Sequence, residues 1–110
     1  MVGEPGLADR VRALLLFEPD VAERRMFGGV CFLIGGHIAV AVSGNDGLLM
    51  RAEPGEYEQV LALPHVAPFV NAGREMRGWV RVGEEAVVED DDLARWVSTG
   101  VDLARALPPK

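Results

Sequence analysis

Two short motifs place arginine beside glycine and bulky apolar side chains. The first runs Arg24-Arg25-Met26-Phe27-Gly28-Gly29, and the second runs Met76-Arg77-Gly78-Trp79. Arginine presents a planar fork of donors that matches a carboxylate or a phosphate, and glycine lets another group approach the backbone closely. These motifs supply the candidate binding residues of the chain, which are Arg25, Met26, Phe27, Gly28, Gly29, Arg77, Gly78 and Trp79.

Two interpretations of Arg25 and Arg77 stay open. Either arginine could hold an anionic group of a partner through its guanidinium fork. The simpler interpretation, which we favour, is that each pairs with one of the 17 acidic residues of the chain, or lays its stem over Phe27 or Trp79. In that case the two arginines stabilise the edge of a sheet.

The remaining reactive residue types do not form a catalytic set. Gly28-Gly29 is followed by Val30 and Cys31, whereas a phosphate-binding loop needs a lysine and a hydroxyl residue there. The glycines are better explained by a bulge or by close packing against the backbone. Cys31, the single cysteine, lies in an apolar run, so we expect a small core residue with a protonated thiol.

Metal-ligating residue types are also poorly placed. His37 follows a glycine pair and His65 follows a proline, so both fit turns, and a zinc site needs more ligands. Residues 89–92 are four consecutive acids, which suit the start of a helix better than a calcium loop. We therefore expect no catalytic residue, no metal site and no cofactor, and the protein is predicted not to be an enzyme.

Composition and charge describe one acidic globular domain. The 110 residues fit a single domain over residues 1–110, with its core at about residues 7–107. A net charge of −6 disfavours binding to a phosphate backbone. The lone cysteine, the short apolar runs and the N-terminus without a basic region predict a cytoplasmic protein that does not enter a membrane.

Hydrophobic spacing predicts the element order α-β-β-β-α-β-β-α. Helices are expected at residues 7–17, 56–63 and from residue 89 onward, each ended by a following proline. Residues 21–23 are expected to be a connection, and strands are expected at residues 26–34, 38–42, 48–52, 66–70 and 78–82. Gly35-Gly36, residues 43–47 and residues 71–73 carry turn signals. This pattern predicts an α+β domain with a mainly antiparallel, five-stranded sheet.

The first three predicted strands are apolar or small on both faces. This pattern indicates that both faces are covered, by helices or by a second subunit. A homodimer is therefore one expectation from the sequence.

The order of the motifs resembles the TfoX N-terminal domain family over residues 7–110. The residues that carry the resemblance are Arg25-Met26-Phe27-Gly28-Gly29, Gly36-His37, Met76-Arg77-Gly78-Trp79-Val80, Leu93-Ala94-Arg95-Trp96-Val97 and Leu107-Pro108-Pro109-Lys110. The resemblance implies an α+β fold related to secretion-chaperone-like and YjbR-like domains, with helices packed on a five-stranded sheet. The family is named after a regulator of natural competence, in which this domain precedes a helical domain.

The resemblance and the missing catalytic set together favour a non-enzymatic regulatory or adaptor domain. We expect it to bind a protein partner through the region of Arg25 and Arg77, with an exposed sheet face as a further surface. Two alternatives stay open. One is a weak nucleic-acid-binding, transcription-related module that uses a local arginine patch, and the other is a small-ligand-binding domain with a pocket beside the sheet.

Overall fold

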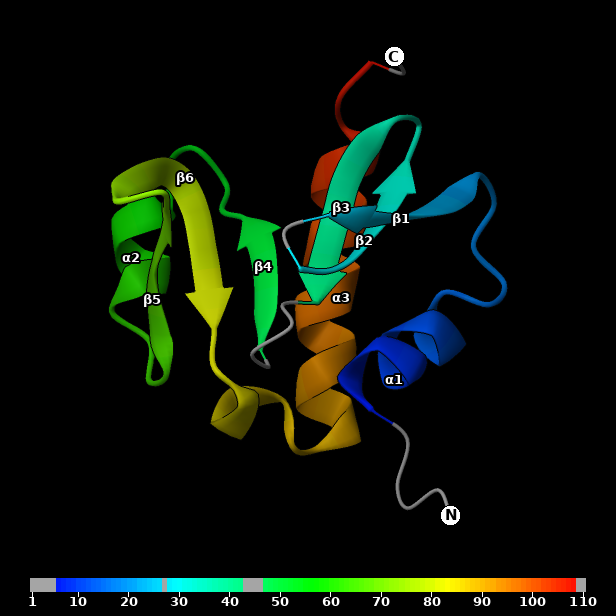
Figure 1. Cartoon of the computed structure of the whole chain (residues 1–110), viewed down its shortest axis with the longest axis horizontal. Coiled ribbons are helices and arrows are strands. Elements are labelled where there is room, and N and C mark those ends of the chain that lie inside the picture. Colours follow the sequence, from blue (N-terminus) through cyan, green and yellow to red (C-terminus); the bar gives the residue numbers. More distant parts are fainter. Residues whose placement is uncertain (1–5, 27, 43–46, 109–110) are drawn as a thin grey trace.

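The computed structural model describes residues 6–26, 28–42 and 47–108. These residues form a curved sheet with helices packed on one side of it (Figure 1). The helices are α1 (Leu7–Leu14), α2 (Tyr57–Leu61) and α3 (Asp90–Arg105), with a 3-10 turn η1 (Glu84–Val87) before α3. The strands are β1 (Val21–Met26), β2 (Gly29–Ile34), β3 (His37–Val42), β4 (Leu48–Arg51), β5 (Val66–Asn71) and β6 (Arg74–Val82). The predicted α+β class is confirmed.

The sheet has six antiparallel strands in the order β1-β2-β3-β4-β6-β5, and not the five that the sequence predicts. The additional strand is β1. Its residues 21–23 were expected to be a connection and Met26 was expected to begin the next strand, because Glu23, Arg24 and Arg25 obscure the apolar alternation. Gly28, with a φ of +73°, lies in the turn between β1 and β2, so the glycine pair does not lie inside one long strand. An edge strand tolerates such charged side chains well.

Two predicted hairpin turns are confirmed. Gly35 and Gly36 have φ values of +61° and +87°, as a primed turn requires, and they connect β2 to β3. Ala72 and Gly73 connect β5 to β6 in the same left-handed region, with φ values of +54° and +79°. The turn predicted at residues 43–47 lies largely outside the described residues.

Strand β6 begins four residues earlier than predicted. Its pairing with β5 changes register between Pro68 and Val70, and Gly78, with a φ of +91°, lies in this irregular stretch. The glycine with a positive φ and the charged residues around it interrupt the alternation of apolar and polar residues, so this part of the strand was not predicted.

The helices end before their prolines. Helix α1 ends at Leu14, five residues before Pro19, and leaves Phe17 93% exposed. Helix α3 carries Asp90, Asp91 and Asp92 in its first turn and Arg105 in its last turn, in agreement with the macrodipole. Glu89 stands at the N-cap position but makes no capping hydrogen bond through its side chain, so the acidic start acts by charge alone.

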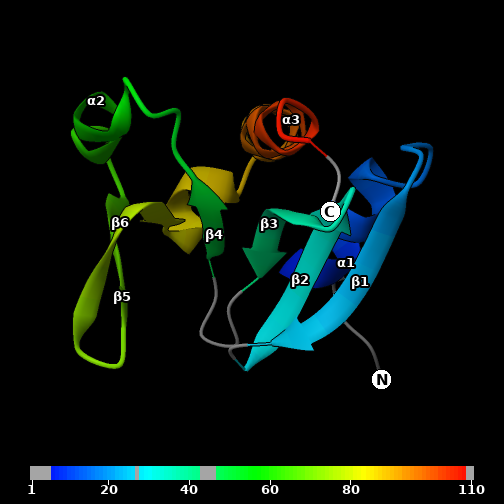
Figure 2. The same ribbon diagram turned by 90° about the horizontal axis from the view of Figure 1, so that it is seen from above.

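The main core lies between the sheet and its three helices. Figure 2 shows α2 and α3 on the same side of the strands. Phe32, Leu48 and Met50 of the strands are fully buried against residues such as Val11 of α1 and Leu93 of α3. None of the helices formed by the described residues is long and apolar enough to cross a membrane.

The opposite face of the sheet carries a second, smaller apolar cluster. Cys31, Ala41 and Leu49 are buried there among Leu33, Ile38 and Phe69, all of which belong to strands. In the part of the chain that the structure describes, helices therefore cover only one of the two apolar faces. We call the other face the open face, and its residues include Arg24, Cys31, Leu33, Ile38, Ala41, Leu49, Arg51, Phe69, Trp79 and Arg81.

Candidate functional site

The two arginines singled out by the sequence do not meet. Arg25 lies in β1 opposite Val30, on the face that the helices cover, and Arg77 lies in β6 beside α2. Strands β2, β3 and β4 separate β1 from β6, so the two backbones lie about 19 Å apart at the usual spacing of about 4.8 Å between strands. One anion cannot be held by both arginines.

Arg77 contacts an aromatic ring and an acidic residue of this chain, as the simpler of the two interpretations expects. Its guanidinium carbon lies 5.2 Å from the centre of the Tyr57 ring, and its Nη2 lies 3.9 Å from Oε2 of Glu58. The aromatic partner is thus Tyr57 of α2 and not Trp79. Both members of the ion pair are mostly exposed, so the pair contributes little to stability.

The other motif residues are scattered over turns and strands. Met26 is paired with Gly29 at the end of the β1–β2 hairpin, whereas Phe27 lies outside the described residues. Trp79 lies on the open face, where the guanidinium carbon of Arg51 sits 5.0 Å from the centre of its ring. Only Trp79, among the predicted residues whose side chains are described, belongs to the site developed below.

Cys31 and the two histidines occupy separate places. Cys31 is fully buried, as predicted, and burial raises the pKa of its thiol. His37 has its Nε2 2.6 Å from the carbonyl oxygen of Pro108, and His65 has its Nδ1 4.0 Å from Oε1 of Glu85. Within the described ranges, no group of three or more His, Cys, Asp or Glu residues could hold a metal ion.

A small hollow lies in the open face. Its volume is about 140 Å³, and it is lined by Ile38, Ala41, Leu49, Phe69, Asn71, Met76 and Trp79. A cavity of about 150 Å³ is large enough for a benzene ring, whereas pockets for drug-sized ligands measure about 300 Å³ or more. The hollow therefore has room for one bulky apolar side chain.

The lining of the hollow combines one small side chain with large ones. Ala41 of β3 is buried and contributes a methyl group only, while Phe69 and Trp79 come from the neighbouring strands β5 and β6. The apolar pattern on both faces was the only sequence signal for it. A pocket beside the sheet was one of the alternatives, but its lining residues could not be named from the sequence, because strand β6 lies beside β4 only in the folded sheet.

Charge is distributed unevenly between the strands and the rest of the chain. The six strands contain six of the 11 basic residues but only two of the 17 acidic residues, Glu23 and Glu75. Glu75 accepts a hydrogen bond of 3.2 Å from the Tyr57 hydroxyl of α2. Glu23 likewise binds Arg12 of α1, so both strand carboxylates face the helices.

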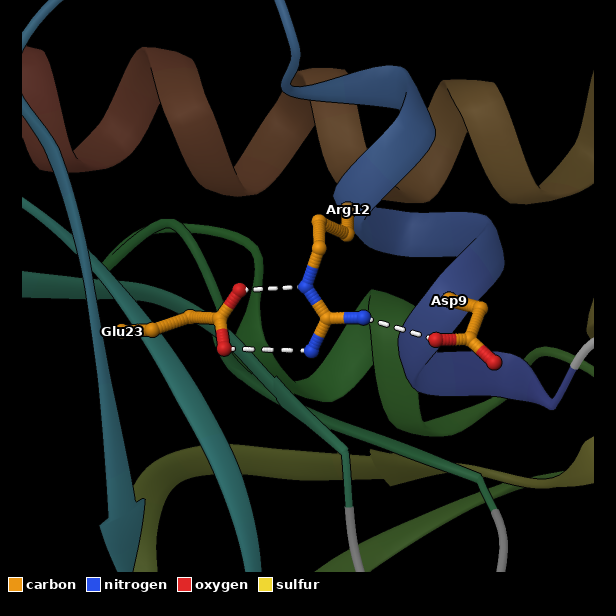
Figure 3. Close-up of polar contacts among 3 residues, drawn as sticks. All are labelled: Asp9, Arg12 and Glu23. Carbon is orange, nitrogen blue, oxygen red and sulfur yellow. Dashed lines mark hydrogen bonds and ion pairs between the residues drawn. The ribbon is translucent and has the colours of Figure 1, made fainter.

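Figure 3 shows how Glu23 is held on the helix side. Arg12 donates from Nε and Nη2 to the two carboxylate oxygens of Glu23, at 2.5 and 3.1 Å, and from Nη1 to Asp9 at 2.7 Å. The hydrogen bond from Arg12 is the main reason why the pKa of Glu23 lies below its usual value. This ion pair fixes α1 to β1 and turns the Glu23 carboxylate away from the open face.

The open face, in contrast, presents arginines. Arg24 lies opposite Cys31, Arg81 lies opposite Leu49, and Arg51 lies over Trp79. Directly opposed residues share a face of the sheet, so these arginines border the apolar cluster. A protein with a net charge of −6 thus has a sheet face that is basic and apolar.

A larger hollow of about 880 Å³ lies between α1 and the start of α3. Gly6 and Leu7 form part of its wall, and the residues before Gly6 are not among those described. Arg10 crosses this region and pairs with Asp90 at 3.0 Å. We assign the candidate site to the open face because its hollow is lined mainly by apolar side chains, whereas the charged residues Asp9, Arg10 and Asp90 line the larger hollow.

Comparison with protein families gives one match. The model of the TfoX N-terminal domain matches residues 13–104. The chain belongs to this family. Comparisons with curated proteins and with solved structures found no match.

The TfoX N-terminal domain match contains the whole sheet. It begins within α1 and ends within α3, so every strand and every residue that lines the small hollow falls inside it. The candidate site is therefore part of the TfoX N-terminal domain itself and does not belong to an extension of it.

Proposed function

We propose that this TfoX N-terminal domain is a non-enzymatic regulatory or adaptor domain that acts in the cytoplasm and binds a protein partner through the open face of its sheet. The observation that carries the proposal is the small apolar hollow, near arginines, on the face that no helix of the described residues covers. Contact surfaces of proteins commonly combine an apolar anchor site with arginine.

The proposed binding residues are Arg24 and Arg51, and no longer Arg25 and Arg77. Arg25 and Arg77 lie toward the helices, and Arg77 already contacts Tyr57 and Glu58. Arg24 and Arg51 instead lie beside the apolar cluster of the open face. The neighbouring residues Arg24 and Arg25 therefore offer a matched pair of test positions.

The test is affinity capture from host lysate, with and without nuclease. The open-face variant is Arg24→Ala with Arg51→Ala, and the matched control is Arg25→Ala with Arg77→Ala. Each variant removes two arginines from strands, so the change in net charge is the same. We expect the open-face variant to lose the captured protein and the control to retain it.

Other outcomes would contradict the proposal in distinct ways. Loss of capture in the control alone would place the partner on the helix side. Capture that disappears after nuclease treatment would favour the nucleic-acid alternative, and no specific capture would contradict an adaptor role. Thermal unfolding of each variant would show that a loss of binding is not a loss of folding, because substitutions of exposed residues usually change stability by no more than about 0.5 kcal/mol.

A further inference from the structure

A second hollow adjoins the small apolar hollow near the turn between β5 and β6. Its volume is about 490 Å³, and it shares Asn71, Met76 and Trp79 with the small hollow. Figure 2 shows this turn on the side of the sheet away from α2 and α3. An apolar hollow and a hollow with charged lining residues thus lie side by side, and we call the two together the hairpin site.

Arg74 brings a positive charge to the hairpin site. It lines the second hollow and is paired directly with Asn71 across the hairpin, so both side chains lie on the open face. Arg74 is exposed, and its guanidinium group makes no hydrogen bond or ion pair with the residues that the structure describes. It can therefore receive an anion beside the amide group of Asn71.

The other two charged residues that line the second hollow are already engaged on the helix side. The Tyr57 hydroxyl donates a hydrogen bond of 3.2 Å to Glu75. The guanidinium group of Arg77 lies over the Tyr57 ring and 3.9 Å from Glu58. Because Tyr57 belongs to α2, Glu75 and Arg77 lie toward the helices, and Arg74 is the lining residue whose charge is left for a ligand.

From this arrangement we propose that the hairpin site binds the C-terminal residue of the partner protein, and that this residue is bulky and apolar. Its side chain enters the small hollow, while its terminal carboxylate pairs with Arg74 and accepts a hydrogen bond from the Asn71 amide. This inference rests on the proposed function and specifies which part of the partner the open face recognises.

Geometry favours a terminal carboxylate over the carboxylate of a neighbouring acidic residue. In a C-terminal residue the side chain and the carboxylate are bonded to one Cα atom, so together they reach two adjoining hollows. In an extended segment the next side chain points to the opposite face, and the one after it lies about 7 Å further along. A C-terminus therefore matches two hollows that share three lining residues.

The size of the small hollow argues against a free apolar acid as the occupant. At about 140 Å³ the hollow takes one group of the size of a benzene ring. Burial of one such group and one exposed ion pair would bind a free acid with a Kd of about 1 mM or weaker. At the end of a protein chain, the same contacts add to those of the surrounding interface.

The experiment selects peptides on the intact protein from a library that displays random eight-residue segments with a free C-terminus. We expect enrichment of aromatic or large aliphatic residues at the last position. The most enriched peptide is then synthesised as the free acid, as the amide, and with its last residue replaced by alanine. Absence of any selected peptide, or peptides without an apolar last residue, would overturn the inference.

Anisotropy measurements with these three peptides test the two contacts separately. Replacing the last residue by alanine should weaken binding by about tenfold or more, because the side chain no longer fills the small hollow. Amidation should weaken binding by about fivefold, because it removes the negative charge that pairs with Arg74. Equal binding of all three peptides would overturn the inference.

Arg74→Gln tests the partner of the carboxylate. The matched control is Arg25→Gln, because Arg25 is also an exposed arginine of a strand but lies on the helix side of β1. The wild type and the control should prefer the acid to the amide, whereas Arg74→Gln should bind the two equally. Binding of the amide by Arg74→Gln shows that this variant is folded. A preference for the acid that survives Arg74→Gln would overturn the inference.

Trp79 provides a direct readout, since it lines both hollows of the hairpin site. In a Trp96→Phe background Trp79 is the remaining tryptophan, because the chain has two. We expect its emission to shift when the selected peptide binds. An unchanged emission would place the peptide elsewhere and overturn the inference.

The lysate capture separates this inference from the proposed function. A captured protein that is lost in the Arg24→Ala/Arg51→Ala variant but retained by Arg74→Gln would overturn the inference and leave the proposed function standing. Selective binding of the free acid through Arg74, with no protein captured from lysate, would support the hairpin site and contradict the proposed function.

Two further measurements identify other occupants. Binding of 3-phenylpropanoate as tight as that of the selected peptide would identify a free acid. Association of the protein with itself, seen by light scattering and abolished by Arg74→Gln, would identify a second copy. Either result would overturn the inference.

Discussion

Arg24 and Arg25 are neighbours in the sequence but serve different sides of the molecule. Successive side chains of a strand point to opposite faces, so Arg24 joins Cys31 on the open face and Arg25 joins Val30 on the helix side. At Glu23 the same alternation brings the carboxylate to Arg12 of α1. One residue of register thus decides whether a charged side chain lies on the helix side or on the open face.

The ion pair between Arg12 and Glu23 makes stability depend on pH. Hydrogen bonding lowers the pKa of Glu23 in the folded state, so its contribution is present above the unfolded pKa and is lost as the pH falls. Glu23→Gln should lower the free energy of unfolding at pH 7 by less than about 1 kcal/mol, because the carboxylate is 41% exposed and solvent screens the pair.

Urea unfolding at several pH values checks this prediction. The difference between wild type and Glu23→Gln should shrink as the pH falls below about 4, where the glutamate of the wild type also becomes protonated. A difference that stays constant across this range would show that packing, and not charge, explains the effect.

Burial makes Cys31 a poor nucleophile. It is 0% exposed, and its raised pKa keeps the thiol protonated at neutral pH. We expect iodoacetamide to label the folded protein much more slowly than the protein in denaturant, as followed by mass spectrometry. Equally fast labelling in the two conditions would contradict the buried position.

Helix α3 and strand β3 approach each other closely at a single glycine. A Cβ atom on Gly100 would stand 2.3 Å from the carbonyl oxygen of Ala39 and 2.8 Å from Cγ1 of Val40. Glycine is unfavourable in the middle of a helix, yet here only glycine leaves room for the strand. The contact sets the distance between the main helix and the centre of the sheet.

Gly100→Ala should therefore destabilise the protein by about 1–3 kcal/mol, because the helix must move away from β3. Chemical unfolding measures the change. Ser98→Ala is the matched control, since Ser98 is exposed on the same helix and alanine should there be neutral or slightly stabilising. Stabilisation by both substitutions would mean that α3 does not lie this close to β3.

The elements that followed from the sequence were those with a strong local signal. The apolar spacing of α1 and α3 and the turn at Gly35-Gly36 were sufficient to place two helices and one hairpin. Strand β1 was missed because an edge strand in this protein carries three consecutive charged residues, and such a segment looks like a connection. The early start of β6 was also missed, because Gly78, which has a positive φ, and the charged residues before it interrupt the apolar alternation.

At the scale of the whole molecule, the two faces of the sheet differ in what covers them. The helices bury one face in the main core, whereas the open face keeps a small apolar cluster among arginines. Most of the acidic residues lie outside the strands. The strands of an acidic protein thus carry more basic than acidic residues, and Arg24, Arg51 and Arg81 lie on the open face.

Leu48 and Leu49 test this division within one strand. Leu48 is completely buried in the main core, and Leu49 is buried in the cluster of the open face. Leu48→Ala should lower the free energy of unfolding by about 3–5 kcal/mol. Leu49→Ala should lower it by less, about 2 kcal/mol, because Leu49 belongs to the smaller apolar cluster and lines a hollow. Urea unfolding of both variants compares them.

A larger cost for Leu49→Ala than for Leu48→Ala would contradict the division into two sides. It would indicate that the open face is itself a covered core surface, as an obligate homodimer would make it. The oligomeric state of the wild type, measured by light scattering at the concentration of the unfolding experiment, distinguishes this case.

The sequence by itself determined the α+β class, the positions of the helices and of two hairpin turns, the burial of Cys31 and the family. These properties depend on local periodicity, on turn chemistry and on the order of motifs along the chain. Only the tertiary structure decided that Arg25 and Arg77 lie apart, and that Arg24, Arg81 and the hollow share one face. Such relations depend on strand order and register, which join residues far apart in the sequence through hydrogen bonds that no local pattern encodes.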